Sequence, residues 1–254
     1  MSKIKFIVSE LIHKLNYSSL KQGNGIEDDI LYSLKKDGYY VYPNFISDEE
    51  CNLLREKADV FIENNPDKVK HESNGCDIRV YGVDRYTNDF NIEKLESFST
   101  RLFKRFSWAR KPDHFMLLGK IIAGENNLGS GSGWHRDSPL RHQFKTIVYL
   151  SDVEESNGPF QYVKGSHAHN SISKVSKFLI KGLNERRFKE KEIVHAINEN
   201  IIPKPTTFIA KAGTVLIVDT RGLHRGKPLE NDKRYALTNY HFENGVNEKF
   251  FQTK

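Results

Sequence analysis

Short apolar segments separated by turn signals fill the chain from about residue 114 onward, and they restrict the fold more than any other feature. Five of them have the length and composition of strands: 114–124, 144–153, 206–210, 214–219 and 234–242. Turn dipeptides such as Asn157–Gly158 and Lys164–Gly165 lie between them. Many short strands joined by tight turns predict an antiparallel sandwich or barrel.

Helices are expected mainly before this region, so the predicted fold class is α+β. Ser47 opens the sequence S-D-E-E, a capping box that predicts a helix at 48–64. The spacing of apolar residues predicts a second helix at 92–106. One basic segment, about 171–198, interrupts the strands and is expected to form a helical insert. The prediction is therefore helices first, then an antiparallel barrel that carries an insert.

The length of 254 residues suits one domain with additions. We expect a single domain at 31–254, preceded by an N-terminal helical extension at 1–30. Within that extension, apolar residues between positions 4 and 15 repeat with helical spacing. No apolar run approaches the length of a transmembrane helix.

Charge and cysteine content narrow the class of partner. The formal net charge of +6 is mild and spread out, which slightly favours an anionic small molecule. Nucleic acid would require a concentrated basic face, so it is not expected. Cys51 and Cys76 are far apart and form no C-x-x-C, which argues against a disulfide framework or a cysteine zinc site. A reducing, cytoplasmic location is expected.

The segment GSGWHRDSP at 131–139 has three interpretations. An HRD triplet occurs in the catalytic loop of protein kinases, but that loop requires an Asn five residues after the Asp, where this chain has His142. An ordinary polar turn is the second interpretation. The third is a metal site, because residues two apart in a strand point to the same side and His135 and Asp137 could bind one ion.

The metal interpretation requires a third ligand from another strand, since a facial triad consists of two histidines and one carboxylate. His224 directly follows the predicted strand at 214–219. Ten residues later, Arg234 opens the strand at 234–242, where a guanidinium could bind a carboxylate through two hydrogen bonds. Two ligands, a distant ligand and an anion-binding residue thus occur in order.

Here the chain resembles the phytanoyl-CoA dioxygenase family of Fe(II)/2-oxoglutarate-dependent oxygenases. Five stretches carry the resemblance, and together they span roughly residues 30–245: 36–59, GWHRDS at 133–138, SNGPFQYVKGSHAH at 156–169, AGTVLIVDTRGLHRG at 212–226 and NDKRYALTNYH at 231–241. The ordered set is far more specific than H-x-D alone. It implies a double-stranded β-helix, the jelly roll of cupin-like barrels, with helices packed outside.

The resemblance also implies site residues. His135, Asp137 and His224 would bind Fe(II), and Arg234 would hold the distal carboxylate of the co-substrate 2-oxoglutarate. Lys120 is a candidate for a further basic contact on the strand before H-x-D. Thr238 lies on the same strand face as Arg234 and is a candidate pocket residue. With O2, such an enzyme oxidises a small molecule and converts 2-oxoglutarate to succinate and CO2.

Asp137 bears on the outcome of the reaction. Halogenases that resemble this family have a small residue at that position, so an aspartate favours hydroxylation. Two alternatives remain open: a jelly-roll protein that binds metal without catalysis, and a cupin-type metalloenzyme that does not use 2-oxoglutarate. The insert is either a substrate lid or a solvated basic helix. The substrate and the oligomeric state do not follow from the sequence.

Overall fold

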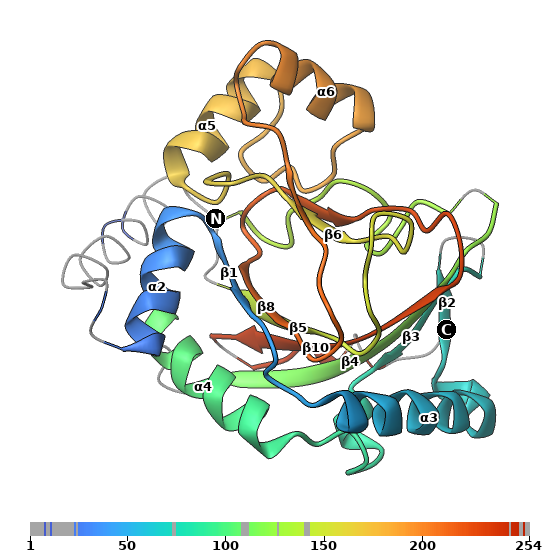
Figure 1. Ribbon diagram of the computed structural model, residues 1–254. Coiled ribbons are helices and arrows are strands. Elements are labelled where there is room, and N and C mark those ends of the chain that lie inside the picture. The colour runs from blue at the N-terminus through green and yellow to red at the C-terminus, as the bar shows by residue number, and fades with distance from the viewer. Residues whose placement is uncertain are drawn as a thin grey trace.

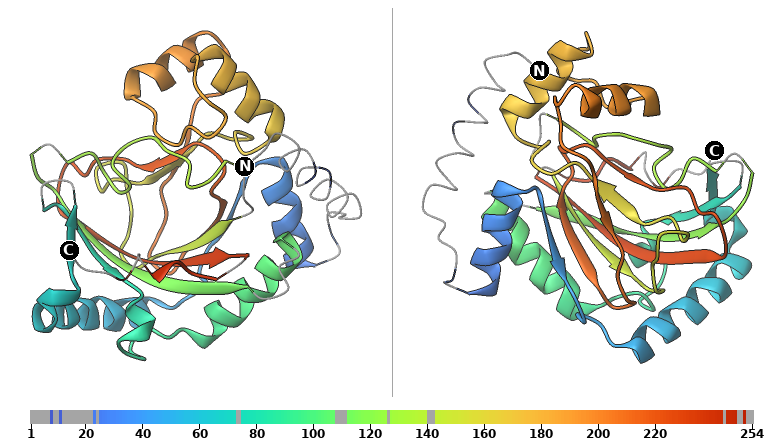
Figure 2. Two further views of the ribbon diagram at one scale, coloured as in Figure 1. Left: turned by 180° about the vertical axis from the view of Figure 1, so that it is seen from behind. Right: turned by 45° about the horizontal axis from the view of Figure 1, so that its top comes forward.

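The computed structural model describes residues 8, 11, 23, 25–72, 75–107, 112–125, 127–139, 143–243, 245–248 and 251. Two antiparallel sheets face each other (Figures 1 and 2). The larger contains, in spatial order, β1 (Tyr39–Tyr42), β8 (Val215–Asp219), β5 (Phe144–Tyr149), β10 (Lys233–Phe242), β4 (Asp113–Ile122), β3 (Asp77–Tyr81) and β2 (Lys70–Glu72). The smaller contains β7 (Thr206–Phe208), β6 (Phe160–Tyr162) and β9 (His224–Gly226). This arrangement confirms the predicted jelly roll.

Helices lie outside the sheets. They are α2 (Ile26–Lys36), α3 (Asp48–Asn64), α4 (Glu93–Ser107), α5 (His169–Phe178) and α6 (Glu190–Asn198), with short 3₁₀ turns at Pro66–Lys68 and Val83–Arg85. In Figure 1, α3 and α4 run along the outer face of the larger sheet, and α5 and α6 lie together beyond the smaller sheet. The predicted helix at 48–64 is confirmed, and the side chain of Ser47 accepts a hydrogen bond from the Glu50 amide at 3.2 Å.

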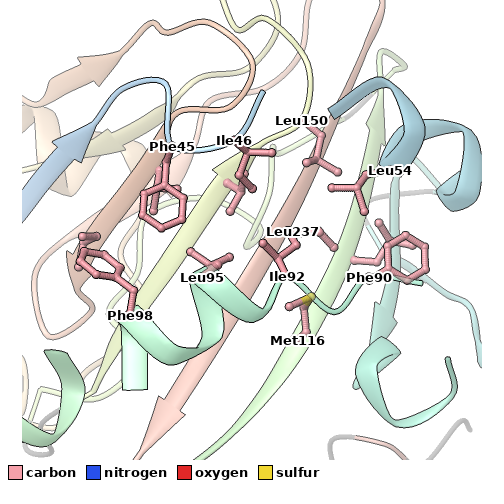
Figure 3. Close-up of a cluster of buried hydrophobic side chains, with 14 of the residues drawn as sticks. Phe45, Ile46, Leu54, Phe90, Ile92, Leu95, Phe98, Met116, Leu150 and Leu237 are labelled. Atoms are coloured by element: carbon pink, nitrogen blue, oxygen red, sulfur yellow. The ribbon is translucent and has the colours of Figure 1, made fainter. Parts of the chain in front are cut away.

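The main hydrophobic core fills the space between the larger sheet and helices α2 to α4. Figure 3 shows Leu95 of α4 near Leu237 of β10, and Phe98 of the same helix beside Phe45. Alternation along β10 then directs Arg234 and Thr238 to the opposite face, which lines the interior between the two sheets. The larger sheet thus has one face buried under helices and one face available for a site.

The insert differs from the prediction of one helical segment. Residues 179–189 between α5 and α6 are not helical, and part of this stretch forms an isolated bridge with the segment that contains H-x-D. The Arg136 amide donates to the Arg186 carbonyl at 2.9 Å, and the Phe188 amide donates to the Trp134 carbonyl at 3.0 Å. A second core, which includes Trp134, Phe188 and Ile193, holds the insert against the barrel.

The predicted N-terminal helix falls almost entirely outside the described residues. The expected boundary at residue 30 lies inside α2, which packs on β1 and β8 through buried Ile30, Leu31 and Leu34. Among the residues that the structure describes, no helix is long and apolar enough to cross a membrane.

His241 gives a test of this core. Its ring contacts Phe103 and Phe144, neither ring nitrogen has a hydrogen-bond partner, and burial lowers its pKa to about 3. The His241 side chain is therefore protonated near pH 6.5 in the unfolded chain but stays neutral in the folded chain. The free energy of unfolding falls as the pH drops below 6.5.

We expect His241→Leu to reduce this acid sensitivity. Between pH 7.5 and 4.5 the variant should lose up to about 2.7 kcal/mol less unfolding free energy than the wild type, since the two pH units below 6.5 each contribute about 1.36 kcal/mol. Urea unfolding at both pH values measures the difference. Equal losses in the two proteins would show that His241 does not contribute to acid sensitivity.

Candidate metal centre

Three side chains predicted to be metal ligands meet between the two sheets. One potential ligand atom from each of His135, Asp137 and His224 lies within 4.8 Å of the others. Asp137 Oδ1 is 3.6 Å from His135 Nε2 and 3.8 Å from His224 Nε2. Small rotations of the side chains would allow one cation to contact all three. Two histidines and one carboxylate form the donor set of non-haem Fe(II) sites.

Backbone hydrogen bonds hold the three residues in this arrangement. His135 and His224 exchange reciprocal amide-to-carbonyl bonds of 2.9 Å, although they are 89 positions apart in the chain (224 minus 135). The Asp137 amide donates to the Thr220 carbonyl at 3.0 Å. The segment with H-x-D is therefore aligned directly beside the segment that carries the distant histidine.

The histidine rings are oriented for metal binding. Nδ1 of His135 bonds the Gly133 carbonyl at 2.8 Å, and Nδ1 of His224 bonds the Gly222 carbonyl at 2.9 Å. A carbonyl can only accept, so each Nδ1 carries the proton and each Nε2 keeps its lone pair. His224 Nε2 is buried and has no hydrogen-bond partner. This orphaned acceptor is explained if a cation occupies the site.

The protonation states also suit a cation. Burial lowers the pKa of His224 to about 4 and moves the pKa of His135 well below its ordinary value, with the neighbouring His224 adding to the effect. Burial alone would raise the pKa of Asp137, but Lys145 and the two histidines outweigh it and hold that pKa far below normal. At neutral pH the site therefore offers two neutral imidazoles and one carboxylate, as metal binding requires.

The absence of a side chain at Gly131 leaves space for the His135 ring. A Cβ atom at Gly131 would lie 2.3 Å from Cε1 of the His135 ring, whereas a Cβ at Gly133 would meet nothing within 4 Å. Both glycines have similar positive φ values, 82° and 86°. Substituting alanine at either position therefore strains the backbone, but only Gly131→Ala also displaces the His135 ring.

We expect Gly131→Ala to weaken Mn(II) or Fe(II) binding by roughly 10- to 100-fold. Gly133→Ala should bind the metal much more nearly as the wild type does. An anaerobic metal titration of the two variants makes the comparison. If they bind equally well, contact with the His135 ring does not limit metal affinity.

A cavity of about 940 Å³ extends from these three residues across the inner face of the larger sheet. Arg234 lines it and is buried, yet Nε and Nη1 of its guanidinium have no hydrogen-bond partner. Burial lowers the Arg234 pKa, and the Tyr149 hydroxyl only partly offsets that effect. Buried guanidinium donors without acceptors are costly, so the cavity fits an anionic ligand at this end. The distal carboxylate of 2-oxoglutarate would supply the missing acceptors.

Thr238 also lines the cavity, in register with Ile147 of β5 and Leu117 of β4. Lys120 does not. Its neighbours Gly119 and Ile121 face the cavity, and Lys120 points through the other face of the sheet, where Nζ is 2.7 Å from Asp59 Oδ1 of α3. The structure therefore places Lys120 apart from the other predicted site residues, because strand alternation turns it outward.

Other basic residues line the cavity instead. Lys145 of β5 contacts Asp137, and Arg79 of β3 pairs with Asp77 at 2.5 Å. Sequence reasoning missed both. A lysine inside the apolar segment 144–149 was the available signal for Lys145, whereas the short segment 77–81 was not expected to be a strand. Arg186 and Arg187 of the insert complete the basic lining.

The family model for phytanoyl-CoA dioxygenase matches residues 34–236. The chain belongs to the phytanoyl-CoA dioxygenase family. The expected cofactors, Fe(II), 2-oxoglutarate and O2, are those of this family, and the donor set and the orphaned Arg234 fit the first two. The chain is thus a member of the 2-oxoglutarate-dependent oxygenases. A search of curated proteins finds no match.

Solved structures agree in fold. The epimerase SnoN from nogalamycin biosynthesis, in complex with Fe³⁺, α-ketoglutarate and nogalamycin RO, is 14% identical with a TM-score of 0.62, covering 85% of this chain and 83% of that one. The carbocyclase SnoK of the same biosynthesis is 16% identical with a TM-score of 0.63, covering 89% of this chain and 85% of that one. EctD from S. alaskensis with bound Fe is 15% identical with a TM-score of 0.63, covering 88% of this chain and 79% of that one. At these identities the likeness establishes the jelly-roll fold of this phytanoyl-CoA dioxygenase family member.

Proposed function

We propose that this protein hydroxylates a small molecule, with 2-oxoglutarate as co-substrate. One atom of O2 enters a C–H bond of the substrate, and the other enters succinate as 2-oxoglutarate loses CO2. The observation that carries the proposal is the pairing, in one cavity, of the His135–Asp137–His224 donor set with the buried guanidinium of Arg234, whose Nε and Nη1 have no hydrogen-bond partner. A protein that only binds metal, or a cupin-type enzyme that uses no keto acid, has no need for this arginine.

The protein's own residues would divide the work. His135, Asp137 and His224 would hold Fe(II), which with 2-oxoglutarate supplies the oxidising power. Arg234 would orient the keto acid by its distal carboxylate. Apolar side chains between these positions, including Ile147 and Phe160, exclude water from the reacting groups. Asp137 occupies the ligand position that halogenases leave open, which favours hydroxylation over halogenation.

Labelled dioxygen tests the reaction type. The holoenzyme is screened against a metabolite library by succinate release, and each hit is repeated under ¹⁸O₂. Hydroxylation predicts a product that gains one oxygen atom carrying the label. A product of unchanged mass, or one that has lost two hydrogens, would instead indicate epimerisation or ring closure, the kinds of reaction named for SnoN and SnoK. A protein that binds both cofactors but never forms succinate would be catalytically idle.

We further propose that the substrate is anionic and that the insert helps to bind it. Arg186 and Arg187 are exposed at the cavity and donate to the carbonyls of Asp137 and Gly131. Within the described part of the chain, neither arginine forms an ion pair with a carboxylate. Their positive charge is therefore available to an anionic substrate group at the entrance.

The double variant Arg186→Gln/Arg187→Gln should raise KM for an anionic substrate at least about tenfold, the cost of roughly 1.4 kcal/mol of lost binding. Lys191→Gln, in α6 of the same insert but away from the cavity, should not. Steady-state kinetics on the substrate found by the screen decides this. A substrate without an anionic group, or equal KM values in both variants, would show that the insert is a solvated basic segment that does not bind the substrate.

Cys51 and Cys76 are both free thiols. The cytoplasmic location proposed from their number and separation remains a prediction, as does the division into an extension at 1–30 and a domain at 31–254.

A further inference from the structure

Lys145 is a buried lysine in direct contact with a metal ligand. It lies on β5, a strand on which every residue is buried, and its Nζ is 2.7 Å from Oδ2 of Asp137. Only 8% of the Lys145 side chain and 17% of the Asp137 side chain are exposed. The contact is a short ion pair rather than a well-aligned hydrogen bond. A charge in such surroundings persists because its partner stabilises it.

The two oxygens of Asp137 consequently have different neighbours. Oδ1 faces the Nε2 atoms of His135 and His224 at 3.6 and 3.8 Å. Oδ2 is turned toward Lys145. The two carboxylate oxygens are therefore in different environments even without a bound cation. Oδ1 belongs to the donor set, and Oδ2 is paired with the Lys145 ammonium.

We infer that Lys145 is a positioning residue that restricts Asp137 to a single metal-facing oxygen, an inference that rests on the proposed iron site. A six-coordinate ion with three protein donor atoms keeps about three open positions. Two of these would accept the carboxylate and carbonyl oxygens of 2-oxoglutarate, and one would remain. If Asp137 bound through both oxygens, it would occupy that last position and leave none for the third reactant, O2.

The position of Lys145 in the sheet supports this role. Lys145 is in register with Tyr240 of β10, and the ammonium lies 4.3 Å from the Tyr240 ring centroid. The strand pairs with β8 on one side and β10 on the other, so the lysine backbone cannot shift easily. The ammonium is thus fixed on the Oδ2 side of the carboxylate, independently of any ligand.

The number of water molecules on bound Mn(II) tests the inference without any turnover. Mn(II)-loaded protein, free of 2-oxoglutarate, accelerates water proton relaxation in proportion to its exchangeable inner-sphere waters. The wild type should show about three such waters, and Lys145→Met about two, because Asp137 is then free to bind through both oxygens. Lys145→Arg, which keeps a cationic donor beside Oδ2, should restore about three.

Lys120→Met is the matched control. Lys120 also lies in the larger sheet and forms an ion pair of 2.7 Å with an aspartate, Asp59, but on the face away from the cavity. It should keep about three waters. If Lys145→Met does not fold, Lys145→Gln replaces it, since its shorter neutral side chain does not reach Oδ2 and the same loss of one water is expected.

Each outcome has a separate meaning. An equal number of waters in the wild type and in Lys145→Met or Lys145→Gln would overturn the inference. Loss of one water in Lys120→Met as well would overturn it too, because the effect would then come from general loosening of the sheet. No relaxation enhancement in the wild type would instead refute the metal site, and with it the proposed function.

Discussion

His224→Ala should abolish both metal binding at this site and the formation of succinate from 2-oxoglutarate. The substitution removes one of the three proposed protein donors, and Nε2 of His224 is buried without a hydrogen-bond partner. Supporting residues around metal ligands typically cost about 10- to 100-fold in affinity or activity when lost. Loss of a ligand itself should exceed the upper end of that range.

The control for this experiment is His241→Leu, which replaces another buried histidine, one that packs among phenylalanines outside the cavity. It should retain metal binding and succinate formation. Fe(II) titration under anaerobic conditions and succinate release in air provide the two measurements. Full metal affinity in His224→Ala would show that the ion is bound elsewhere.

Arg234→Met should weaken 2-oxoglutarate binding with little effect on metal binding. Removing one partner of a buried charge pair costs about 2–5 kcal/mol, which corresponds to roughly a 30- to 4,000-fold increase in the dissociation constant for the keto acid. In the absence of 2-oxoglutarate the variant should be no less stable than the wild type, because it lacks a buried guanidinium that has unsatisfied donors.

Lys120→Met is the informative comparison, since both basic residues were predicted from the sequence to contact 2-oxoglutarate. The ion pair with Asp59 places Lys120 on the helix-covered face, so this variant should bind 2-oxoglutarate normally. Anaerobic titration of the Fe(II)-loaded proteins measures both constants. The reverse pattern, with Lys120→Met weakened and Arg234→Met unchanged, would contradict the placement of the cavity.

The contrast between Lys120 and Lys145 shows what the sequence could not predict. Both lie on strands whose two faces are largely buried, one against the helices and one against the cavity. Apolar alternation therefore does not reveal which face a residue joins. Strand alternation places Lys120 opposite Gly119 and Ile121, and only the folded sheet shows which of its two faces lines the cavity.

Local signals, in contrast, were sufficient for several elements. The Ser47 cap and the apolar spacing behind it predicted α3, because capping and amphipathic periodicity act within a few residues. The short strands β2 and β3 were missed, since β3 forms by pairing with β4 and β2 by pairing with β3, and neither has a strand-like pattern long enough to predict it.

The candidate metal site was predictable only as an ordered set. H-x-D places two donors on one side of a strand, but the proximity of His224 depends on backbone pairing between segments far apart in the chain. The order of H-x-D, the distant histidine and the arginine carried that information. The partners of the insert were not predictable, because residues 186–188 form backbone hydrogen bonds and an isolated bridge with the H-x-D segment instead of forming a helix.

The most direct test of the account is an anaerobic titration of the purified protein with Fe(II) and then 2-oxoglutarate, followed by visible absorption. We predict an iron–keto-acid charge-transfer band that appears only when both are present, is absent in His135→Ala, and requires much more 2-oxoglutarate in Arg234→Met. Absence of the band in the wild type, or an unchanged band in His135→Ala, would contradict the assignment of this cavity as an Fe(II)/2-oxoglutarate site.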